Sequence, residues 1–221
     1  MKRFVQVAAA ACVAVLGFAG HAAAQPQGDR PFSVQLDGGV ALGSQTSGAF
    51  GLEADYALNE KLAVFAEVSM ISNVTPKFIT DRANVVATAL GGTADTKDKA
   101  TFGTIGAKYT LLAVDAPYRP YVGVGFTYGK IAKTTSVTVG GAAADEAQLL
   151  STYGVQLGSD LAGSLSKAGI GVVVGVTRSI GERLGVDLSY RFNRFMPKTS
   201  EIEDDQAINA QRVAIGVLFR F

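Results

Sequence analysis

Apolar and polar side chains alternate along eight segments of the chain. In the segment that spans residues 184–193, Leu184 and Val186 fall on one face, and Gly185 and Asp187 fall on the other. The same period of two recurs in residues 32–42, 49–58, 62–69, 101–111, 120–130, 169–180 and 212–221. Successive side chains of a β-strand point to opposite faces, so this pattern predicts eight strands.

The two faces of these predicted strands differ in composition. One face is almost free of charge and carries its Tyr and Phe residues mainly toward the segment ends. The other face consists of Gly, Ala, Ser and Thr with scattered charges. A soluble β-sandwich also alternates, but small residues in such number suit the inside of a narrow barrel better than a wet surface. We therefore predict an all-β, eight-stranded antiparallel transmembrane β-barrel. The sheet must close because lipid offers no hydrogen-bond partners for the backbone groups of an open edge.

The connectors between the segments differ in length in a regular way. Short connectors occupy residues 59–61, 112–119 and 181–183, and long polar connectors occupy residues 71–100, 131–168 and 194–211. The connector 43–48 is the exception, because it is short although the other connectors at its end of the predicted barrel are long. Bacterial barrels have short periplasmic turns and longer extracellular loops, so both termini are expected in the periplasm. Residues 81–90 are expected to form a helical turn within their loop.

The N-terminus has the composition of a secretory signal. Lys2 and Arg3 precede an apolar run over residues 4–19, and Ala22 and Ala24 form the small-residue pattern that precedes cleavage. A membrane anchor helix is the alternative, but the run is short for a span of about 20 apolar residues. We expect residues 1–24 to be a cleaved signal peptide and residues 25–221 to be a single outer-membrane β-barrel domain.

Removal of this segment changes the chemistry available to the chain. The lone cysteine, Cys12, and the lone histidine, His21, both lie within it. Cys12 as a lipidation site is disfavoured, because more apolar residues follow it. Loss of Lys2 and Arg3 lowers the basic count from 20 to 18, against 19 acidic residues. We therefore expect no disulfide, no metal site, no cofactor and no nucleic-acid partner.

The expected mature sequence also lacks a histidine that could act as a catalytic base. Serine and water are poor nucleophiles near neutral pH without a base, and histidine is the usual one. No Ser-x-x-Lys run or paired-carboxylate motif replaces it, and the Gly-x-Gly at residues 123–125 lies within a predicted strand. We therefore expect no catalytic residues and a protein that is not an enzyme.

The polar face of the predicted barrel carries a cluster of charges. Its members are Asp37, Glu53, Glu67, Lys108, Asp187, Arg191 and Arg212, with Asp55 and Arg220 on the same face. Eight strands leave an interior just wide enough for side chains, and unpaired charge there is costly. We expect these groups to pair and to fill the lumen. A narrow channel for ions or small solutes is the alternative.

The turn at residues 59–61 makes this expectation specific. If Leu58 pairs with Leu62, Glu53 lies directly opposite Glu67, and both carboxylates point into the lumen. Like charges in this position repel each other, so a cation should lie between them. Arg191 is the first candidate and Lys108 the second, because a guanidinium can serve two carboxylates at once.

Residues 30–221 resemble a known family. The sequences of residues 56–62, 119–125 and 184–191 are similar to recurring strand and turn motifs of the small outer-membrane barrel superfamily. This superfamily includes OmpA-type and opacity-type surface proteins. The chain end, with Phe219 and Phe221, resembles the signal that the barrel-assembly machinery reads in this family. No peptidoglycan-binding domain follows, so cell-wall anchoring is not expected.

The resemblance implies a location and a function. It implies a monomer in the outer membrane of a Gram-negative bacterium, in contact with membrane lipid, lipopolysaccharide and the barrel-assembly machinery. It also implies a non-enzymatic surface barrel that supports the envelope or binds a host or cell-surface partner through its loops, as adhesin-like and opacity-like proteins do. The narrow channel remains the alternative function.

Overall fold

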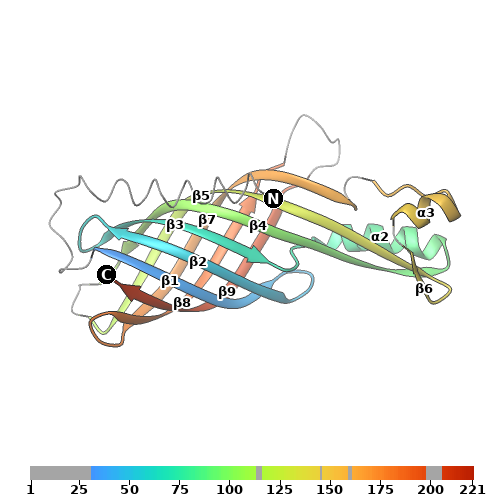
Figure 1. Ribbon diagram of the computed structural model, residues 1–221. Coiled ribbons are helices and arrows are strands. Elements are labelled where there is room, and N and C mark those ends of the chain that lie inside the picture. Colours follow the sequence, from blue (N-terminus) through green and yellow to red (C-terminus); the bar gives the residue numbers. More distant parts are fainter. Residues whose placement is uncertain (1–30, 113–115, 145, 159–160, 198–205) are drawn as a thin grey trace.

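The computed structural model describes residues 31–112, 116–144, 146–158, 161–197 and 206–221, and the expected signal peptide lies outside them. Eight long antiparallel strands form a closed barrel (Figure 1). They are β1 (Phe32–Leu42), β2 (Ser47–Ala57), β3 (Leu62–Ile71), β4 (Gly92–Thr110), β5 (Tyr118–Val139), β7 (Gly163–Ser179), β8 (Leu184–Phe195) and β9 (Ile208–Arg220). Their order is β4-β3-β2-β1-β9-β8-β7-β5, and the β4–β5 pair closes the ring. The predicted fold is confirmed.

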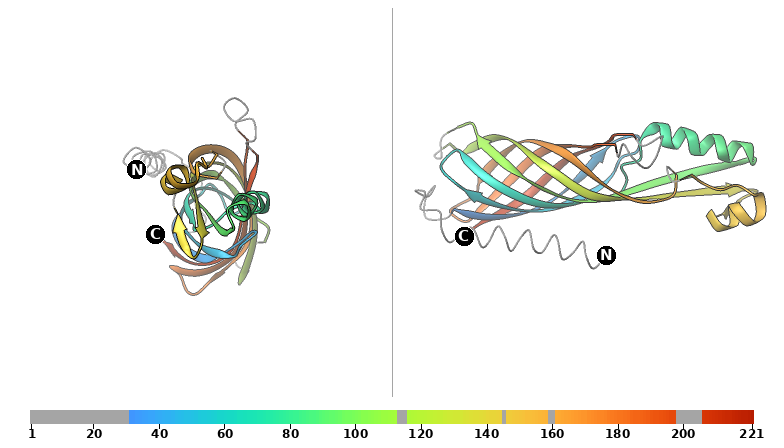
Figure 2. Two further views of the ribbon diagram at one scale, coloured as in Figure 1. Left: turned by 90° about the vertical axis from the view of Figure 1, so that its right-hand side faces the viewer. Right: turned by 90° about the horizontal axis from the view of Figure 1, so that it is seen from above.

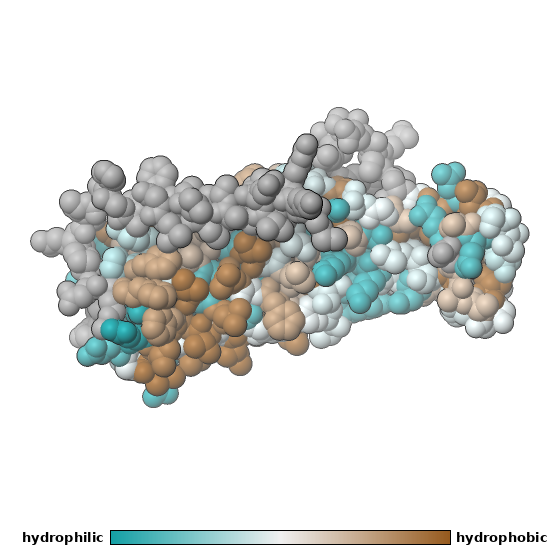
Figure 3. Space-filling model, viewed as in Figure 1, coloured by the Kyte–Doolittle hydropathy of each residue, from teal (hydrophilic) through white to brown (hydrophobic). Residues whose placement is uncertain are grey.

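Alternation along the strands decides which residues lie outside the barrel. Leu36 and Phe126 are 65% and 60% exposed on the outer face, whereas Glu53 and Arg191 are 0% and 2% exposed in the lumen. Figure 3 shows apolar residues gathered on the half of the molecule that carries the short turns. We call this outward apolar surface the apolar belt. Its strands leave no open edge, because each pairs with a neighbour on both sides.

The short turns lie at the same end as the chain's last residue (Figure 1). In the β2–β3 turn, the Asn59 side-chain oxygen accepts hydrogen bonds from the amides of Lys61 and Leu62, each at 2.9 Å. The amide of Leu58 donates to the carbonyl oxygen of Leu62, which fixes the register of the hairpin. β1 and β9 pair with each other, so the first and last strands of the barrel are neighbours in the sheet.

The β4–β5 hairpin continues far beyond the barrel, which corrects the expectation that residues 71–100 and 131–168 are loops. β4 has 19 residues and β5 has 22, and they pair from Thr110–Tyr121 out to Gly92–Val139. The alternation in this extension was missed because its outward residues are polar and resemble a loop. Outside the apolar belt, the outward face of a strand meets water and needs no apolar side chains.

Two helices cover the hairpin extension. The expected helical turn at residues 81–90 is a 13-residue helix, α2 (Lys77–Ala89), and β6 (Ala142–Ala144) and α3 (Glu146–Tyr153) follow β5. Their buried side chains form a second apolar core, made of Ile79, Ala83, Ala87, Val137, Ala144, Leu149, Leu157 and Leu161. We call this unit the distal head. It lies at the end of the molecule away from the short turns (Figure 2).

Candidate functional site in the barrel lumen

Two glutamates face each other on one wall of the lumen. The register of β2 and β3 pairs Glu53 with Glu67, as the turn at residues 59–61 predicts. Both side chains are buried. The opposite wall has the same arrangement with the opposite sign, because β8 and β9 pair Arg191 with Arg212. Each wall therefore holds two adjacent like charges.

The two walls meet in a network of ion pairs. Arg191 Nη1 donates to Glu53 Oε2 at 2.8 Å and to Glu67 Oε2 at 2.7 Å. Arg212 donates through Nη2 to Glu67, and its Nη1 lies 3.5 Å from Asp37 Oδ1. Arg191 thus occupies the place between the two glutamates that the sequence assigned to it first. We call these residues, together with Lys108, Asp55 and Asp187, the ionic layer.

Lys108, the second candidate, contacts the same network from the side of the short turns. Its Nζ donates to Glu53 and also to Asp55 Oδ1, the latter at 2.9 Å. The ammonium lies 5.1 Å from the ring centroids of both Phe65 and Tyr121, a distance at which cation–π attraction operates. Three cations and four glutamate or aspartate side chains therefore meet in the middle of the lumen.

The aspartates Asp187 and Asp37 are accommodated by neutral hydrogen-bond donors and by a glycine, respectively. Asp187 accepts hydrogen bonds from Gln35 at 3.1 Å, Tyr121 at 3.1 Å and Thr177 at 3.0 Å. Asp37 pairs in register with Gly51. A Cβ at Gly51 would lie 2.7 Å from Asp37 Oδ2, so glycine supplies the space for the carboxylate. All seven sequence-predicted lumen residues are buried in the barrel.

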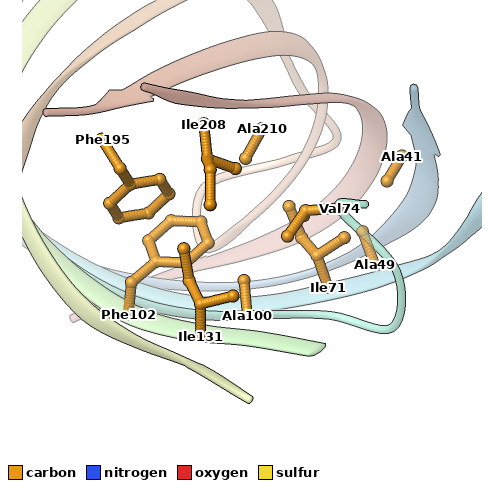
Figure 4. Close-up of a cluster of buried hydrophobic side chains, with 10 residues drawn as sticks. All are labelled: Ala41, Ala49, Ile71, Val74, Ala100, Phe102, Ile131, Phe195, Ile208 and Ala210. Atoms are coloured by element: carbon orange, nitrogen blue, oxygen red, sulfur yellow. The ribbon is translucent and has the colours of Figure 1, made fainter. Parts of the chain in front are cut away.

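An apolar layer follows the ionic layer in the direction of the distal head, since Phe102 lies nearer than Lys108 to the end of β4 that enters the hairpin extension. Figure 4 shows the side chains of this layer. It consists of Ala41, Ala49, Ile71, Val74, Ala100, Phe102, Ile131, Phe195, Ile208 and Ala210. The rings of Phe102 and Phe195 pack edge to face, with centroids 5.3 Å apart. Sequence reasoning missed this layer because it searched the inward positions for charge. Large apolar residues at inward positions near the strand ends are the signal that would have found it.

The segment of residues 72–76 packs against this layer through Val74. Ser47 Oγ donates to the carbonyl oxygen of Asn73 at 3.0 Å, and Asn73 Nδ2 donates to Gln45 Oε1 at 3.0 Å. On the other side, the Asn73 side-chain oxygen accepts from the amide of Asp98 at 3.2 Å. These bonds tie the segment to the β1–β2 connector and to β4, and they leave Val74 in the apolar layer. We call this segment the strap.

Asp98, beneath the strap, has a shifted acidity. It lies in the hairpin extension, outside the apolar belt, and its side chain is buried. Burial raises the pKa of Asp98 from 3.8 to about 6, although the charge of Lys133 and a hydrogen bond from Thr75 favour the ionised form. The strap therefore lies against a carboxyl group whose pKa falls between the usual value for aspartate and neutral pH.

The opposite end of the lumen is open. A cavity of about 300 Å³ leads from the short-turn end to the ionic layer. Lys108, Asp55 and Tyr121 line its inner part, and Arg119 and Arg220 are also in its lining. Within the described ranges, no three His, Cys, Asp or Glu side chains are grouped so that they could hold a metal ion. No helix in those ranges is long and apolar enough to cross a membrane.

The two C-terminal phenylalanines lie on the outside of the barrel. Phe219 and Phe221 pack edge to face with centroids 4.8 Å apart, and Phe221 also contacts Phe32 at 5.7 Å. The amide of Phe221 donates to the carbonyl oxygen of Phe32 at 2.9 Å. The residues predicted as an assembly signal thus form an exposed aromatic edge at the seam between the first and last strands.

One solved structure supports the fold, and two more are similar at lower TM-scores. The barrel is similar to Neisserial surface protein A, with 18% identity, 86% of this chain and 97% of that chain covered, and a TM-score of 0.53. The N-terminal β-barrel domain of Pseudomonas aeruginosa OprF matches at 13% identity, with the same coverage and a TM-score of 0.49. OprG from Pseudomonas aeruginosa matches at 12% identity over 89% of this chain and 99% of that chain, with a TM-score of 0.48.

Comparison of the sequence itself gives the family. No match was found among curated proteins. The family model described as "Outer membrane protein beta-barrel domain" matches residues 9–221, which is nearly the whole chain. This match agrees with the closed eight-stranded barrel and its outward apolar belt. The chain therefore belongs to the outer membrane protein β-barrel domain family.

Proposed function

We propose that the protein is a non-enzymatic, non-conducting surface barrel that displays the distal head outside the cell. The observation that carries this proposal is the closure of the lumen by two different layers in series. Short turns and both termini face the periplasm, as is usual for bacterial barrels. The signal peptide of residues 1–24 directs export, the barrel-assembly machinery inserts the chain, and the protein acts as a monomer.

The ionic layer opposes the passage of ions. An ion that enters from the short-turn cavity meets Glu53, Glu67 and Arg191, which are already held in ion pairs with one another. Separating one partner from a buried ion pair costs about 3–5 kcal/mol, since the other is left without compensation. The layer therefore acts as a structural plug.

The apolar layer opposes the passage of water and polar solutes. Phe102, Ile131 and Phe195 are buried across the lumen and offer no hydrogen-bonding group. Polar solutes would lose their hydration there without replacement. The strap supports this layer, because Val74 packs in it and the strap's side-chain hydrogen bonds reach both β4 and the β1–β2 connector.

The distal head supports a role in surface contact. Its own apolar core gives it a defined shape, which a set of polar loops would lack. Val85 of α2 and Leu150 of α3 are large apolar side chains exposed on it. Exposed apolar residues on a folded unit favour contact with another macromolecule, such as a host or cell-surface partner. The similar fold of a protein named as a surface protein agrees with this role.

Planar-bilayer conductance of the refolded protein tests whether the barrel is closed. We expect no single-channel steps from the wild type or from Phe126→Ala, which alters only the outer face. A variant with Glu53→Ser, Arg191→Ser, Phe102→Ser and Phe195→Ser shortens large side chains in both layers and should conduct, which shows that the assay detects an open lumen. Regular steps from the wild type would instead support the alternative function, a narrow channel fed by the short-turn cavity.

Epitope insertion in whole cells tests the orientation. A tag placed between Gly140 and Gly141, in the turn after β5, should bind antibody on intact cells. The same tag at Glu182, in the β7–β8 turn, should bind only after the outer membrane is permeabilised. The reverse pattern would place the distal head in the periplasm and end its proposed role in surface contact.

A further inference from the structure

The cavity at the short-turn end is large enough to hold a small molecule. Its volume of about 300 Å³ lies at the lower end of the range for ligand pockets. Gly181 and Glu182 of the β7–β8 turn are in its lining, so it opens at the end where the chain's last residue lies (Figure 1). Lys108 and Asp55 of the ionic layer form its floor. The cavity is therefore a blind pocket that ends at the ionic layer.

Two arginines on different strands line this cavity. Arg119 lies on β5, and Arg220 is the last residue of β9. Arg119 Nη2 donates to the carbonyl oxygen of Glu60 at 3.2 Å, which holds the side chain beside the β2–β3 turn. Arg119 and Arg220 are close enough for their charges to interact. Like charges repel each other, so an anion between the two guanidinium groups would stabilise both.

Arg220 is available to such an anion. Among the residues that the structure describes, its guanidinium group takes part in no ion pair or hydrogen bond. The register places Asp55 two strands away from Arg220, because Ser33 of β1 pairs with both of them. Asp55 Oδ1 already accepts a hydrogen bond from Lys108 Nζ at 2.9 Å. The positive charge of Arg220 is thus left for a ligand.

Three hydroxyl groups in the lining are also available to a ligand. Ser33, Thr110 and Ser179 line the cavity, and their side chains form no hydrogen bond with the described residues. The hydroxyls of Tyr121 and Thr177, by contrast, donate to Asp187 at 3.1 and 3.0 Å. A guanidinium group and hydroxyl donors together suit the oxygens of a carboxylate or a phosphate.

The charges in the lining decide between these two anions. Three cationic and two acidic side chains line the cavity, namely Lys108, Arg119, Arg220, Asp55 and Glu182. One positive charge is therefore in excess, and a carboxylate balances it with a single negative charge. A phosphate group carries about −1.5 to −2 at pH 7 and would leave negative charge without compensation in a partly buried site.

The cavity also has a small apolar wall. Ala57 and Ala63 pair directly on β2 and β3, and Leu218 lines the cavity from β9. The two alanines leave space beside the charged groups, and a short hydrocarbon chain would be removed from water there. A ligand with a carboxylate at one end and a few carbon atoms at the other fits both parts of the lining.

We propose that this cavity binds a small carboxylic acid in its ionised form. The carboxylate lies between Arg220 and Arg119 and accepts hydrogen bonds from the neighbouring hydroxyls, and the hydrocarbon part packs against Ala57 and Ala63. The inference goes beyond surface contact by the distal head, since it concerns the other end of the molecule. It requires no passage through the lumen and holds for either orientation in the membrane.

Ligand-observed NMR of the refolded protein in detergent tests the proposal, with propionate as the probe. Saturation transfer to propionate should be saturable with the wild type and absent from empty micelles. Propionamide has the same shape without the charge and should bind more weakly. Arg220→Gln should weaken propionate binding by about tenfold, the effect expected for one hydrogen bond to a charged group. Ala63→Leu should also weaken it, because the larger side chain narrows the cavity without a change in charge.

Arg178→Gln is the matched control. Arg178 lies between Thr177 and Ser179 in the chain, but its guanidinium group lies over the ring of Tyr118 at 5.1 Å and is not in the lining. Its loss should leave propionate binding unchanged, and Arg220→Lys should retain most of it. Equal losses in Arg178→Gln and Arg220→Gln, unchanged binding by Arg220→Gln, equal binding of propionamide, or tighter binding of inorganic phosphate would overturn the proposal. Heat-modifiable gel mobility verifies that each variant is folded.

Discussion

At the scale of single residues, the lumen contains two pairs of like charges, and each pair is stabilised by the opposite charges of the other. Glu53 and Glu67 repel each other across β2 and β3, and Arg191 and Arg212 repel each other across β8 and β9. Neither wall would be stable in a dry interior without the other. Arg191 is central because one of its nitrogens contacts both glutamates.

Arg191→Ala should therefore lower the free energy of unfolding by about 3–5 kcal/mol, the usual cost of breaking a buried ion pair from one side. Adding Glu53→Gln to the same chain should restore part of the loss, because it removes one of the two carboxylates that repel each other once Arg191 no longer lies between them. Urea unfolding in detergent measures both effects. Arg194→Ala, on the outer face of the same strand, serves as the control and should change little. Equal stability of Arg191→Ala and the wild type would show that the network does not hold the barrel together.

Gly51 gives a second prediction at this scale. A Cβ at this position would lie 2.7 and 2.8 Å from the Asp37 carboxylate oxygens and 3.0 Å from Arg212 Nη1. Gly51→Ala should therefore destabilise the barrel by about 1–3 kcal/mol through overpacking. Gly103→Ala is the matched control, since its Cβ would have Glu67 O at 3.6 Å as its nearest contact. Comparable urea midpoints for the two variants would contradict the steric argument.

At the scale of elements, the strap and the hairpin extension form a unit that should respond to pH. Because folding raises the pKa of Asp98, the folded state binds the proton more tightly than the unfolded chain does. The strap should therefore be most stable in acid and should weaken as the pH rises from 3.8 to about 6. Above that range it should change no further.

Hydrogen exchange checks this dependence. After correction for intrinsic rates, the amides of Asn73 and Thr75 should exchange more slowly below the pKa of Asp98 than at neutral pH. Asp98→Asn should remove the difference, because an amide does not titrate. Amides of β1 and β9, far from Asp98 in the sheet order, should be unaffected in both proteins. The same dependence in Asp98→Asn would assign the effect to another group.

The last strand carries a prediction about assembly. Phe219 and Phe221 form an exposed aromatic edge beside Phe32, so they are accessible to a factor that guides insertion. Deletion of Phe221 or Phe221→Ser should lower the folded yield in cells. Refolding in detergent should suffer less, because no assembly factor acts there. Unchanged yield in cells would exclude this role for the chain end.

At the scale of the whole molecule, two folded parts share one sheet. The barrel is built around a polar lumen with a lipid-facing belt, whereas the distal head has an apolar core and a wet surface. β4 and β5 belong to both parts, and the change occurs where their outward residues turn from apolar to charged. The continuous β4–β5 hairpin therefore carries the head beyond the barrel.

Export gives a prediction about the mature chain. If residues 1–24 are a cleaved signal peptide, the intact mass of the protein from outer-membrane material should lack Met1 to Ala24. A mass that retains this segment, or one that includes acyl chains on Cys12, would require a different route to the membrane. The result also decides whether the only histidine, His21, is present in the working protein.

The sequence by itself determined which residues of the eight alternating segments face inward, and the register of the β2–β3 hairpin. Both depend on local rules, because side chains alternate with a period of two and the turn at residues 59–61 is short. Only the tertiary structure decided which walls meet: Arg191 and Glu53 are 138 residues apart in the chain, and closure of the ring brings them to 2.8 Å. It also decided the distal head, where Ala83 of α2 and Leu149 of α3 belong to one core although the β4–β5 hairpin separates them in the chain. Contacts of that kind depend on packing between distant segments, and alternation within a segment carries no information about its distant partner.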